Sequence, residues 1–125
     1  MQQTFDLSRP IAVSLLAILQ FVLDDDEAQR IIKHLMDPLV PGSVLALSTV
    51  TTDGSPAEAS RGVSSYNSSG VPARSRTKAE VEALFEGLDL LDPGVVLVHR
   101  WRPDEQDRAI RDDQVFMYGA IAVKP

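Results

Sequence analysis

Four consecutive acidic residues form the densest group of chemically capable side chains in this 125-residue sequence: Asp24, Asp25, Asp26 and Glu27. Their carboxylate oxygens could bind a divalent cation, although the spacing matches no calcium-binding loop. Negative side chains also stabilise the positive end of a helix dipole, so one aspartate is expected to cap a following helix. A third interpretation places Asp24 or Asp25 against a ligand beyond the end of the preceding strand.

The two histidines are the other candidates for acid–base chemistry. We expect His34 to be an ordinary exposed residue on a helix. His99 could act as a general base, but no serine or cysteine nucleophile motif accompanies it, which favours a packed or rim histidine. The neighbouring Arg100, Trp101 and Arg102 could contact an anion or a nucleic acid. Their acidic surroundings favour packing at a solvated rim instead.

Composition narrows the possible functions. The formal charge of −6 and the pI near 4.7 argue against nonspecific nucleic-acid binding, which needs a basic face. The absence of cysteine excludes disulfides, thiolate zinc sites and cysteine nucleophiles. The apolar run from Ile11 to Leu23 is shorter than the roughly twenty residues that span a bilayer. We therefore expect a cytoplasmic protein without a membrane or nucleic-acid partner, folded as one domain over residues 1–125.

The acidic residues lie inside a predicted strand–helix–strand unit. Ile11 to Val22 is apolar at alternate and intervening positions, which predicts a strand buried on both faces. The helix that follows shows a stripe at helical spacing: Ala28, Ile31, Ile32, Leu35 and Met36. Pro38 ends this helix, and Val44 to Val50 forms a second buried strand. Two such strands joined by a helix are parallel, and their ligands bind beyond the carboxyl ends, here near Gln20 to Asp26.

The remainder of the chain predicts two more helices and a β-rich end. One helix begins at Ser55-Pro56 and ends near Asn67, and residues 71–76 are expected to be extended. A second has the capping pattern Thr77-Lys78-Ala79-Glu80 and stops at Gly87.

Short strands follow at Leu88 to Leu91, Val95 to Trp101 and Gln114 to Val123, with a charged loop over Arg102 to Asp113. The predicted fold class is therefore α/β, a mostly parallel sheet with one reversed strand at its end. Ser48 and Thr49, at the end of the second strand, could bind a ligand or simply begin a turn, and both interpretations stay open.

Five phrases in order give the chain a resemblance to the C-terminal half of a bacterial S-adenosyl methyltransferase family of undefined substrate. They run from about Phe5 to Pro125: SRPIAVSLLAILQFVLDDDEA, LVPGSVLALS, YNSSGVPARSRTKAEVEALFEGLDLLDPGVV, RWRPDE and YGAIAVKP. The resemblance implies a partial Rossmann-like sheet. Ile11–Val22, Val44–Val50, Val95–Trp101 and Gln114–Val123 would be its fourth, fifth, sixth and antiparallel seventh strands.

The resemblance also implies the cofactor, S-adenosylmethionine, and a site. The segment after the fourth strand would line the cofactor, through Leu19, Gln20, Phe21, Asp24 and Asp25. The glycine-rich turn that holds the methionine part of the cofactor precedes this region of the family. The family pattern has histidine at the position of Gln20, proline at Leu23 and histidine at Thr49. No catalytic base and no metal ligand is assigned, so Gln20 with Asp24 or Asp25 would orient rather than transfer protons.

Two functions follow as hypotheses. The first is one half of a methyltransferase, active when a missing half completes it. The second is a non-catalytic binding or regulatory module that docks on a partner. In either case the edge of the strand Ile11–Val22 would carry unpaired backbone groups, which predicts a homodimer or a complex with a complementing chain through that edge.

Overall fold

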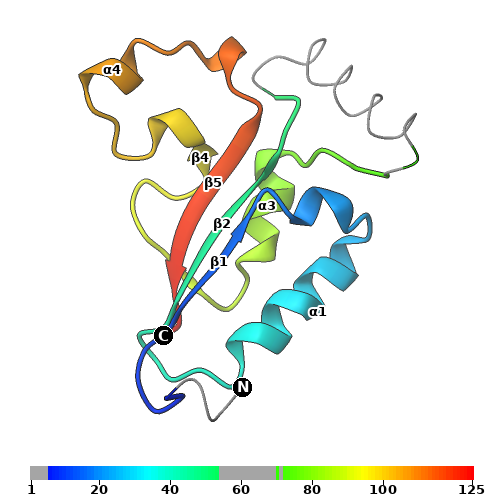
Figure 1. Ribbon diagram of the computed structural model, residues 1–125, viewed down its shortest axis with the longest axis vertical. Helices are drawn as coiled ribbons and strands as arrows, with labels where there is room; N and C mark the ends of the chain where they lie inside the picture. The colour runs from blue at the N-terminus through cyan, green and yellow to red at the C-terminus, as the bar shows by residue number, and fades with distance from the viewer. Residues whose placement is uncertain (1–5, 54–69, 71) are drawn as a thin grey trace.

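A mixed sheet lies at the centre of the computed structural model, which describes residues 6–53, 70 and 72–125 (Figure 1). In that part of the chain the strand order is β1-β2-β5-β3, and β4 also pairs with β5. The strands are β1 (Ala12–Leu16), β2 (Val44–Val50), β3 (Asp89–Leu90), β4 (Val96–Leu97) and β5 (Met117–Val123). The predicted helix from Ser55 to Asn67 lies outside the described residues.

The pairing confirms the predicted crossover. β1 and β2 are parallel, with Ala12 opposite Val44 and Leu16 opposite Ser48. β5 is antiparallel to β2, as expected for the reversed strand. Its position differs from the prediction, however, because β5 lies inside the sheet, between β2 and the short strands β3 and β4. The seven-residue β5 pairs with the whole of β2, whereas β3 and β4 each pair with only two of its residues.

The predicted strand Ile11–Val22 is too long. β1 ends at Leu16 because Ala17 adopts a left-handed backbone with φ 56°. The N–H of Ala17 then donates to the carbonyl oxygen and the Oγ of Ser48, at 3.0 and 3.1 Å. The chain continues as the 3₁₀ turn η1 (Leu19–Phe21).

Burial of β1 on both faces is also wrong. Ala12, Ser14 and Leu16 are exposed, whereas Val13 and Leu15 pack against the core. The reason is that the two longer helices, Asp25–Met36 and Lys78–Leu84, pack on the face of the sheet that carries Leu45, Leu47, Ala120 and Ala122.

Two further boundaries are corrected. The predicted strand Val95–Trp101 contains only β4 and then turns into η2 (Val98–Arg100). The loop predicted over Arg102–Asp113 contains the short helix α4 (Glu105–Arg108) and the 3₁₀ turn η3 (Asp112–Gln114). Asp104 caps α4 by accepting a hydrogen bond from the Asp107 N–H at 2.8 Å, which is a local signal typical of a helix start.

The two longer helices agree with their sequence signals. α1 (Asp25–Met36) begins at the cap Asp24, whose Oδ1 accepts from the Asp26 N–H at 3.0 Å, and it buries Ala28, Ile32 and Met36. Leu35 of the predicted stripe is instead 37% exposed.

α3 (Lys78–Leu84) has the predicted capping box, in which Thr77 and Glu80 bond each other's backbone N–H groups. Gly87 follows it with φ +85°, the left-handed conformation expected of a helix stop. Within residues 6–53, 70 and 72–125, no helix is long and apolar enough to cross a bilayer.

Candidate functional site

The segment that follows β1 is an irregular turn at the carboxyl end of the strand. Its η1 turn buries Leu19 and Gln20, which are 1% and 4% exposed, and leaves Phe21 42% exposed. The turn packs against β2, the neighbouring parallel strand. The structure therefore brings together three of the five predicted cofactor residues at the edge where ligands bind in sheets of this kind.

Gln20 has a buried amide oxygen without a partner. Its Oε1 is buried and accepts no hydrogen bond from the described residues. Its backbone carbonyl does have a partner, because it accepts from the Arg74 N–H at 2.9 Å. An unpaired buried acceptor costs about 1–3 kcal/mol, so this oxygen is suited to a hydrogen-bond donor supplied from outside the turn.

Thr49, on β2, also has a buried side-chain oxygen for which the described residues supply no partner. Its side chain is fully buried and its Oγ1 has no partner among the described residues. Ser48 differs, because its Oγ accepts from the Ala17 N–H at the end of β1. Of the two interpretations left open for this pair, Ser48 therefore has a structural role, whereas Thr49 keeps a free polar atom.

Asp24 and Asp25 are both occupied by contacts within the protein. Asp24 caps α1. Oδ1 of Asp25 accepts from Arg76 Nε at 2.8 Å and from Arg74 Nη1 at 3.1 Å. The hydrogen bond from Arg76, with the positive charges of both arginines, lowers the pKa of Asp25 below its usual value. Both aspartates therefore have a structural role at the turn, and their carboxylates are already engaged by other groups of the protein.

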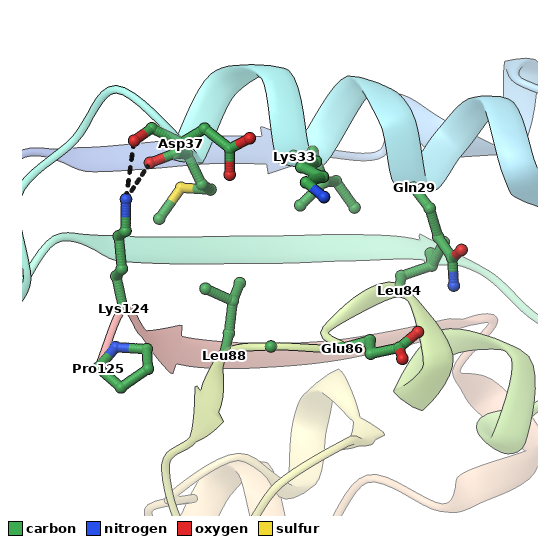
Figure 2. A pocket seen from close by; sticks show the side chains of 11 residues that line it. Gln29, Lys33, Asp37, Leu84, Glu86, Leu88, Lys124 and Pro125 are labelled. Atoms are coloured by element: carbon green, nitrogen blue, oxygen red, sulfur yellow. Dashed lines mark hydrogen bonds between the residues drawn. The ribbon is translucent and has the colours of Figure 1, made fainter.

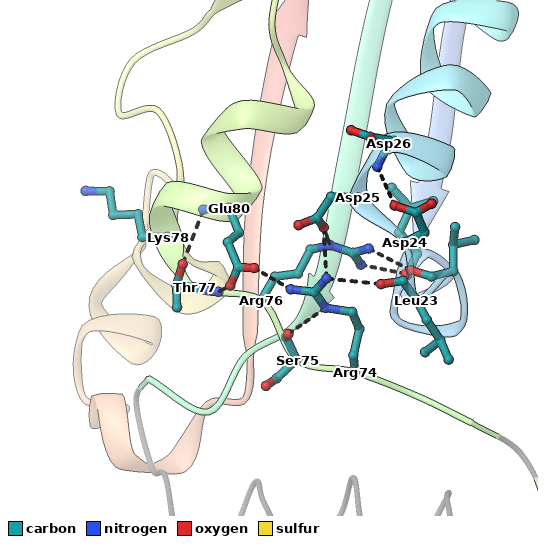
Figure 3. Close-up of polar contacts among 12 residues, drawn as sticks. Leu23, Asp24, Asp25, Asp26, Arg74, Ser75, Arg76, Thr77, Lys78 and Glu80 are labelled. Carbon is teal, nitrogen blue, oxygen red and sulfur yellow. Dashed lines mark hydrogen bonds and ion pairs between the residues drawn. The ribbon is translucent and has the colours of Figure 1, made fainter.

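Arg74 and Arg76 are the site residues that sequence reasoning missed (Figure 3). The Arg76 side chain has no exposed surface, and it donates to the carbonyl oxygens of Leu19 at 2.7 Å and Val22 at 2.6 Å. Arg74 Nη1 donates to the Leu23 carbonyl oxygen at 3.0 Å, and Arg74 also pairs with Glu80. No local pattern signals the bonds from these arginines to the turn, because donor and acceptor are about fifty residues apart.

A second polar group lies just beyond the carboxyl end of β2. Asp53 Oδ2 accepts from the Tyr118 hydroxyl at 2.8 Å and from the Lys78 N–H at 3.3 Å. Burial raises the pKa of Tyr118 to about 12, and the hydrogen bond to Asp53 and its negative charge act in the same direction. The phenol is therefore a hydrogen-bond donor to Asp53 at neutral pH.

The remaining candidates form a separate cluster on η2 and the following loop. His99 Nε2 lies 2.9 Å from Asp112 Oδ1, and its side chain is 6% exposed. Arg100 binds the same carboxylate through two contacts of 2.7 Å, and the Arg102 guanidinium lies 4.4 Å from the centre of the Trp101 ring. This matches the predicted packed histidine at a charged rim. His34 is exposed, as expected.

A cavity of about 490 Å³ opens at the other end of α1 (Figure 2). Its floor is apolar, and Lys33, Glu86 and Lys124 are among its charged lining. Lys124 Nζ donates to the carbonyl oxygens of Met36, Asp37 and Leu39, which satisfies the last turn of α1. None of the predicted site residues lines this cavity. In the described ranges no group of three histidine, aspartate or glutamate side chains is placed to hold a metal ion.

Known proteins that are similar to this chain indicate its family. The sequence profile of a family described as S-adenosyl methyltransferase matches residues 1–125. A DUF574 family protein from Streptomyces avermitilis has 46% sequence identity and a TM-score of 0.95, with 100% of this chain and 48% of that chain covered. A candidate methyltransferase from Thermobifida fusca has 28% identity and a TM-score of 0.82, covering 98% of this chain and 46% of that one.

A more distant structure supports the fold alone. A SAM-dependent methyltransferase from Methanosarcina mazei has 16% identity and a TM-score of 0.59, covering 90% of this chain and 58% of that chain. No curated protein matches the sequence. The chain thus spans about half the length of the first two structures that it matches.

Proposed function

Because this chain belongs to the S-adenosyl methyltransferase family, we propose that it supplies one half of an S-adenosylmethionine-dependent methyltransferase. It would act as a single domain over residues 1–125, in the cytoplasm, and would provide the strands that follow the cofactor-gripping turn of a Rossmann-like sheet. The observation that carries the proposal is Gln20 Oε1, which is buried in the turn after β1 and has no partner among residues 6–53, 70 and 72–125.

The proposed role of this turn is orientation. Leu19, Gln20 and Phe21 would form a wall of the cofactor site, and Asp24 and Asp25 would hold that wall in place. S-adenosylmethionine, when bound, supplies an activated methyl group. Its transfer depends on alignment of nucleophile, methyl carbon and leaving sulfur. A glutamine amide can accept a hydrogen bond from an ammonium or hydroxyl group, but it is not a general base. The chain would therefore help to position the cofactor.

The rest of the site would come from a partner that adds to β1. Among the described residues β1 pairs only with β2, so its other edge is open. Large apolar side chains near that edge are exposed: Leu16 58%, Ile18 49%, Phe21 42% and Leu23 47%. We propose that a complementing chain, or a second copy of this chain, covers the open edge of β1, because an uncovered edge beside an apolar cluster favours association.

Cofactor binding is tested on the chain mixed with the part of the Streptomyces avermitilis protein that lies outside the match. The measurement is calorimetric titration with S-adenosylmethionine. Gln20→Leu should weaken binding about tenfold or more, because the only acceptor offered by this side chain is removed. Gln106→Leu, on the exposed face of α4, is the matched control and should leave the affinity unchanged. Equal affinities of the two variants for S-adenosylmethionine would show that Gln20 does not bind the cofactor.

Association is tested by light scattering over a range of protein concentrations. The wild-type chain alone should form dimers, or should join the added complementing chain, and Leu16→Lys should reduce either assembly. Leu90→Lys is the control, since Leu90 is also an exposed strand residue but lies on β3. A wild-type chain that stays monomeric at high concentration and does not join the complementing chain would exclude the proposed edge contact.

The alternative function is a non-catalytic binding or regulatory module. The observation that favours it is that Asp24 and Asp25, two of the five residues assigned to the cofactor, are already occupied within the protein. The calorimetric titration separates the two functions. A complex that forms through β1 but takes up no S-adenosylmethionine would support the binding module.

A further inference from the structure

The turn after β1 bonds only part of its backbone internally, because it belongs neither to the sheet nor to α1. Its carbonyl oxygens are nevertheless used, and the donors come from one short segment. Arg76 donates to Leu19 and Val22, and Arg74 donates to Gln20 and Leu23. Four carbonyls of a five-residue turn are thus bound by two residues that lie about fifty positions later.

Arg76 is the central member of this contact. Its side chain is fully buried, although a buried guanidinium is costly unless every donor has an acceptor. Its Nε, Nη1 and Nη2 reach Asp25 Oδ1, Leu19 O and Val22 O at 2.8, 2.7 and 2.6 Å. The planar fork of arginine suits such divergent acceptors, whereas the single ammonium of lysine does not.

The backbone of Arg76 is anchored as firmly as its side chain. Its N–H donates to the Val50 carbonyl oxygen at 3.0 Å, at the end of β2. The next residue, Thr77, caps α3. Arg76 therefore joins the end of β2 and the start of α3 to the turn after β1, and through Asp25 to the first turn of α1 (Figure 3).

We propose that Arg76 is a positioning residue that fixes the conformation of residues 19–23 and so presents Gln20 to the ligand. The identity of that ligand rests on the proposed function. The effect of Arg76 on the backbone of residues 19–23 does not. It predicts that loss of the arginine fork loosens the η1 turn while the sheet stays intact.

The test is amide hydrogen exchange of the full-length chain, followed at single-residue resolution. The informative amides are those of Phe21 and Val22, which donate to the carbonyls of Ile18 and Leu19 within the turn. Arg76→Lys should accelerate their exchange about tenfold or more, because charge-assisted bonds to the turn are lost. Amides of β2 and β5 should keep their wild-type rates. Arg102→Lys, at a distant exposed arginine, should change neither group.

A milder pair of variants covers the case in which Arg76→Lys does not fold. Asp25→Asn removes the carboxylate partner of Arg76 but keeps both carbonyl bonds, so the Phe21 and Val22 amides should accelerate by a smaller factor. Asp24→Asn is the matched control, since asparagine also caps helices and the carboxylate that pairs with Arg76 is that of Asp25. Wild-type exchange at Phe21 and Val22 in Arg76→Lys, or equal effects of the two aspartate variants, would overturn the proposal.

Affinity for S-adenosylmethionine in the complemented protein gives the second readout. Arg76→Lys should lower it about tenfold, in step with the faster exchange of the turn. Faster exchange with unchanged affinity would overturn the positioning role. If the wild-type complex takes up no S-adenosylmethionine, the proposed function fails, while the exchange result alone still decides whether Arg76 fixes the turn.

Discussion

Gln20 and Arg76 are both buried polar side chains of one site, but they differ in how their polar atoms are satisfied. Arg76 has acceptors for all three of its guanidinium nitrogens, whereas Gln20 Oε1 has no donor in the described part of the chain. The sequence predicted Gln20 near the carboxyl end of an apolar strand, and the family resemblance assigned it to the cofactor site. It did not predict Arg76, because neighbouring residues in the sequence carry no information about carbonyl oxygens more than fifty positions away.

Replacement of Gln20 by leucine should stabilise the folded chain. Leucine has a similar size and removes the unpaired oxygen, so the free energy of unfolding should rise by about 1 kcal/mol. Urea denaturation followed by circular dichroism measures the change, with Gln106→Leu as the exposed control. A loss of stability would mean that the amide makes a favourable contact in the free protein.

The stabilising effect of Asp25 should depend on pH. Its pKa is lowered in the folded state, so its contribution is complete above the usual aspartate pKa, about 4, and is lost as the pH falls through the folded value. The side chain is 42% exposed, so we expect solvent to screen the pair and limit the difference between wild type and Asp25→Asn to about 1 kcal/mol at pH 7. Urea titrations at pH 7 and at successively lower pH below 4 should show that difference and then its progressive decrease. A difference that is independent of pH would assign it to packing.

At the scale of elements, patterns that act over a few residues predicted structure well. The capping box at Thr77, the cap at Asp24 and the stop at Gly87 all lie where expected, because each signal and its partner are within four residues. β2 has its predicted bounds, but the strands predicted over Ile11–Val22 and Val95–Trp101 were too long, because apolar runs continue past the point where pairing stops. Ala17 and Arg102 have positive φ, and no glycine marks either turn.

Removal of the capping box should weaken α3. Thr77→Ala leaves the Glu80 N–H without its side-chain acceptor, which should lower the free energy of unfolding by about 1 kcal/mol. Thr52→Ala, at a half-buried threonine outside the helices, is the control for urea denaturation. Equal effects of the two substitutions would show that the cap contributes nothing specific.

Close packing of η2 on the sheet depends on Gly119. A Cβ at this position would lie 2.8 Å from Val98 Cγ1, so Gly119→Ala should destabilise the protein by about 1–3 kcal/mol. Val98→Ala in the same chain should recover part of the loss, because it removes the clashing methyl group. Thermal unfolding of the single and double variants measures the coupling. Strictly additive effects would contradict direct contact between the two residues.

At the scale of the whole molecule, residues 6–53, 70 and 72–125 leave one edge of β1 unpaired, and the core that they form with α1 and α3 lies on one face of the sheet. The topology of a parallel crossover with an inserted antiparallel strand agrees with solved structures that are about twice as long. The order of the strands along the chain could be predicted from hydrophobic periodicity. The place of β5 inside the sheet was not, because sequence patterns do not specify which strands are neighbours.

In the proposed arrangement, this chain carries one wall of an S-adenosylmethionine site and a partner on β1 carries the rest. Calorimetric titration of the cofactor tests it most directly, first into the chain alone and then into an equimolar mixture with the unmatched part of the Streptomyces avermitilis protein. We expect little or no heat from the chain alone and saturable binding with one cofactor per complex from the mixture. A complex that forms but gives no binding heat would contradict the proposed arrangement.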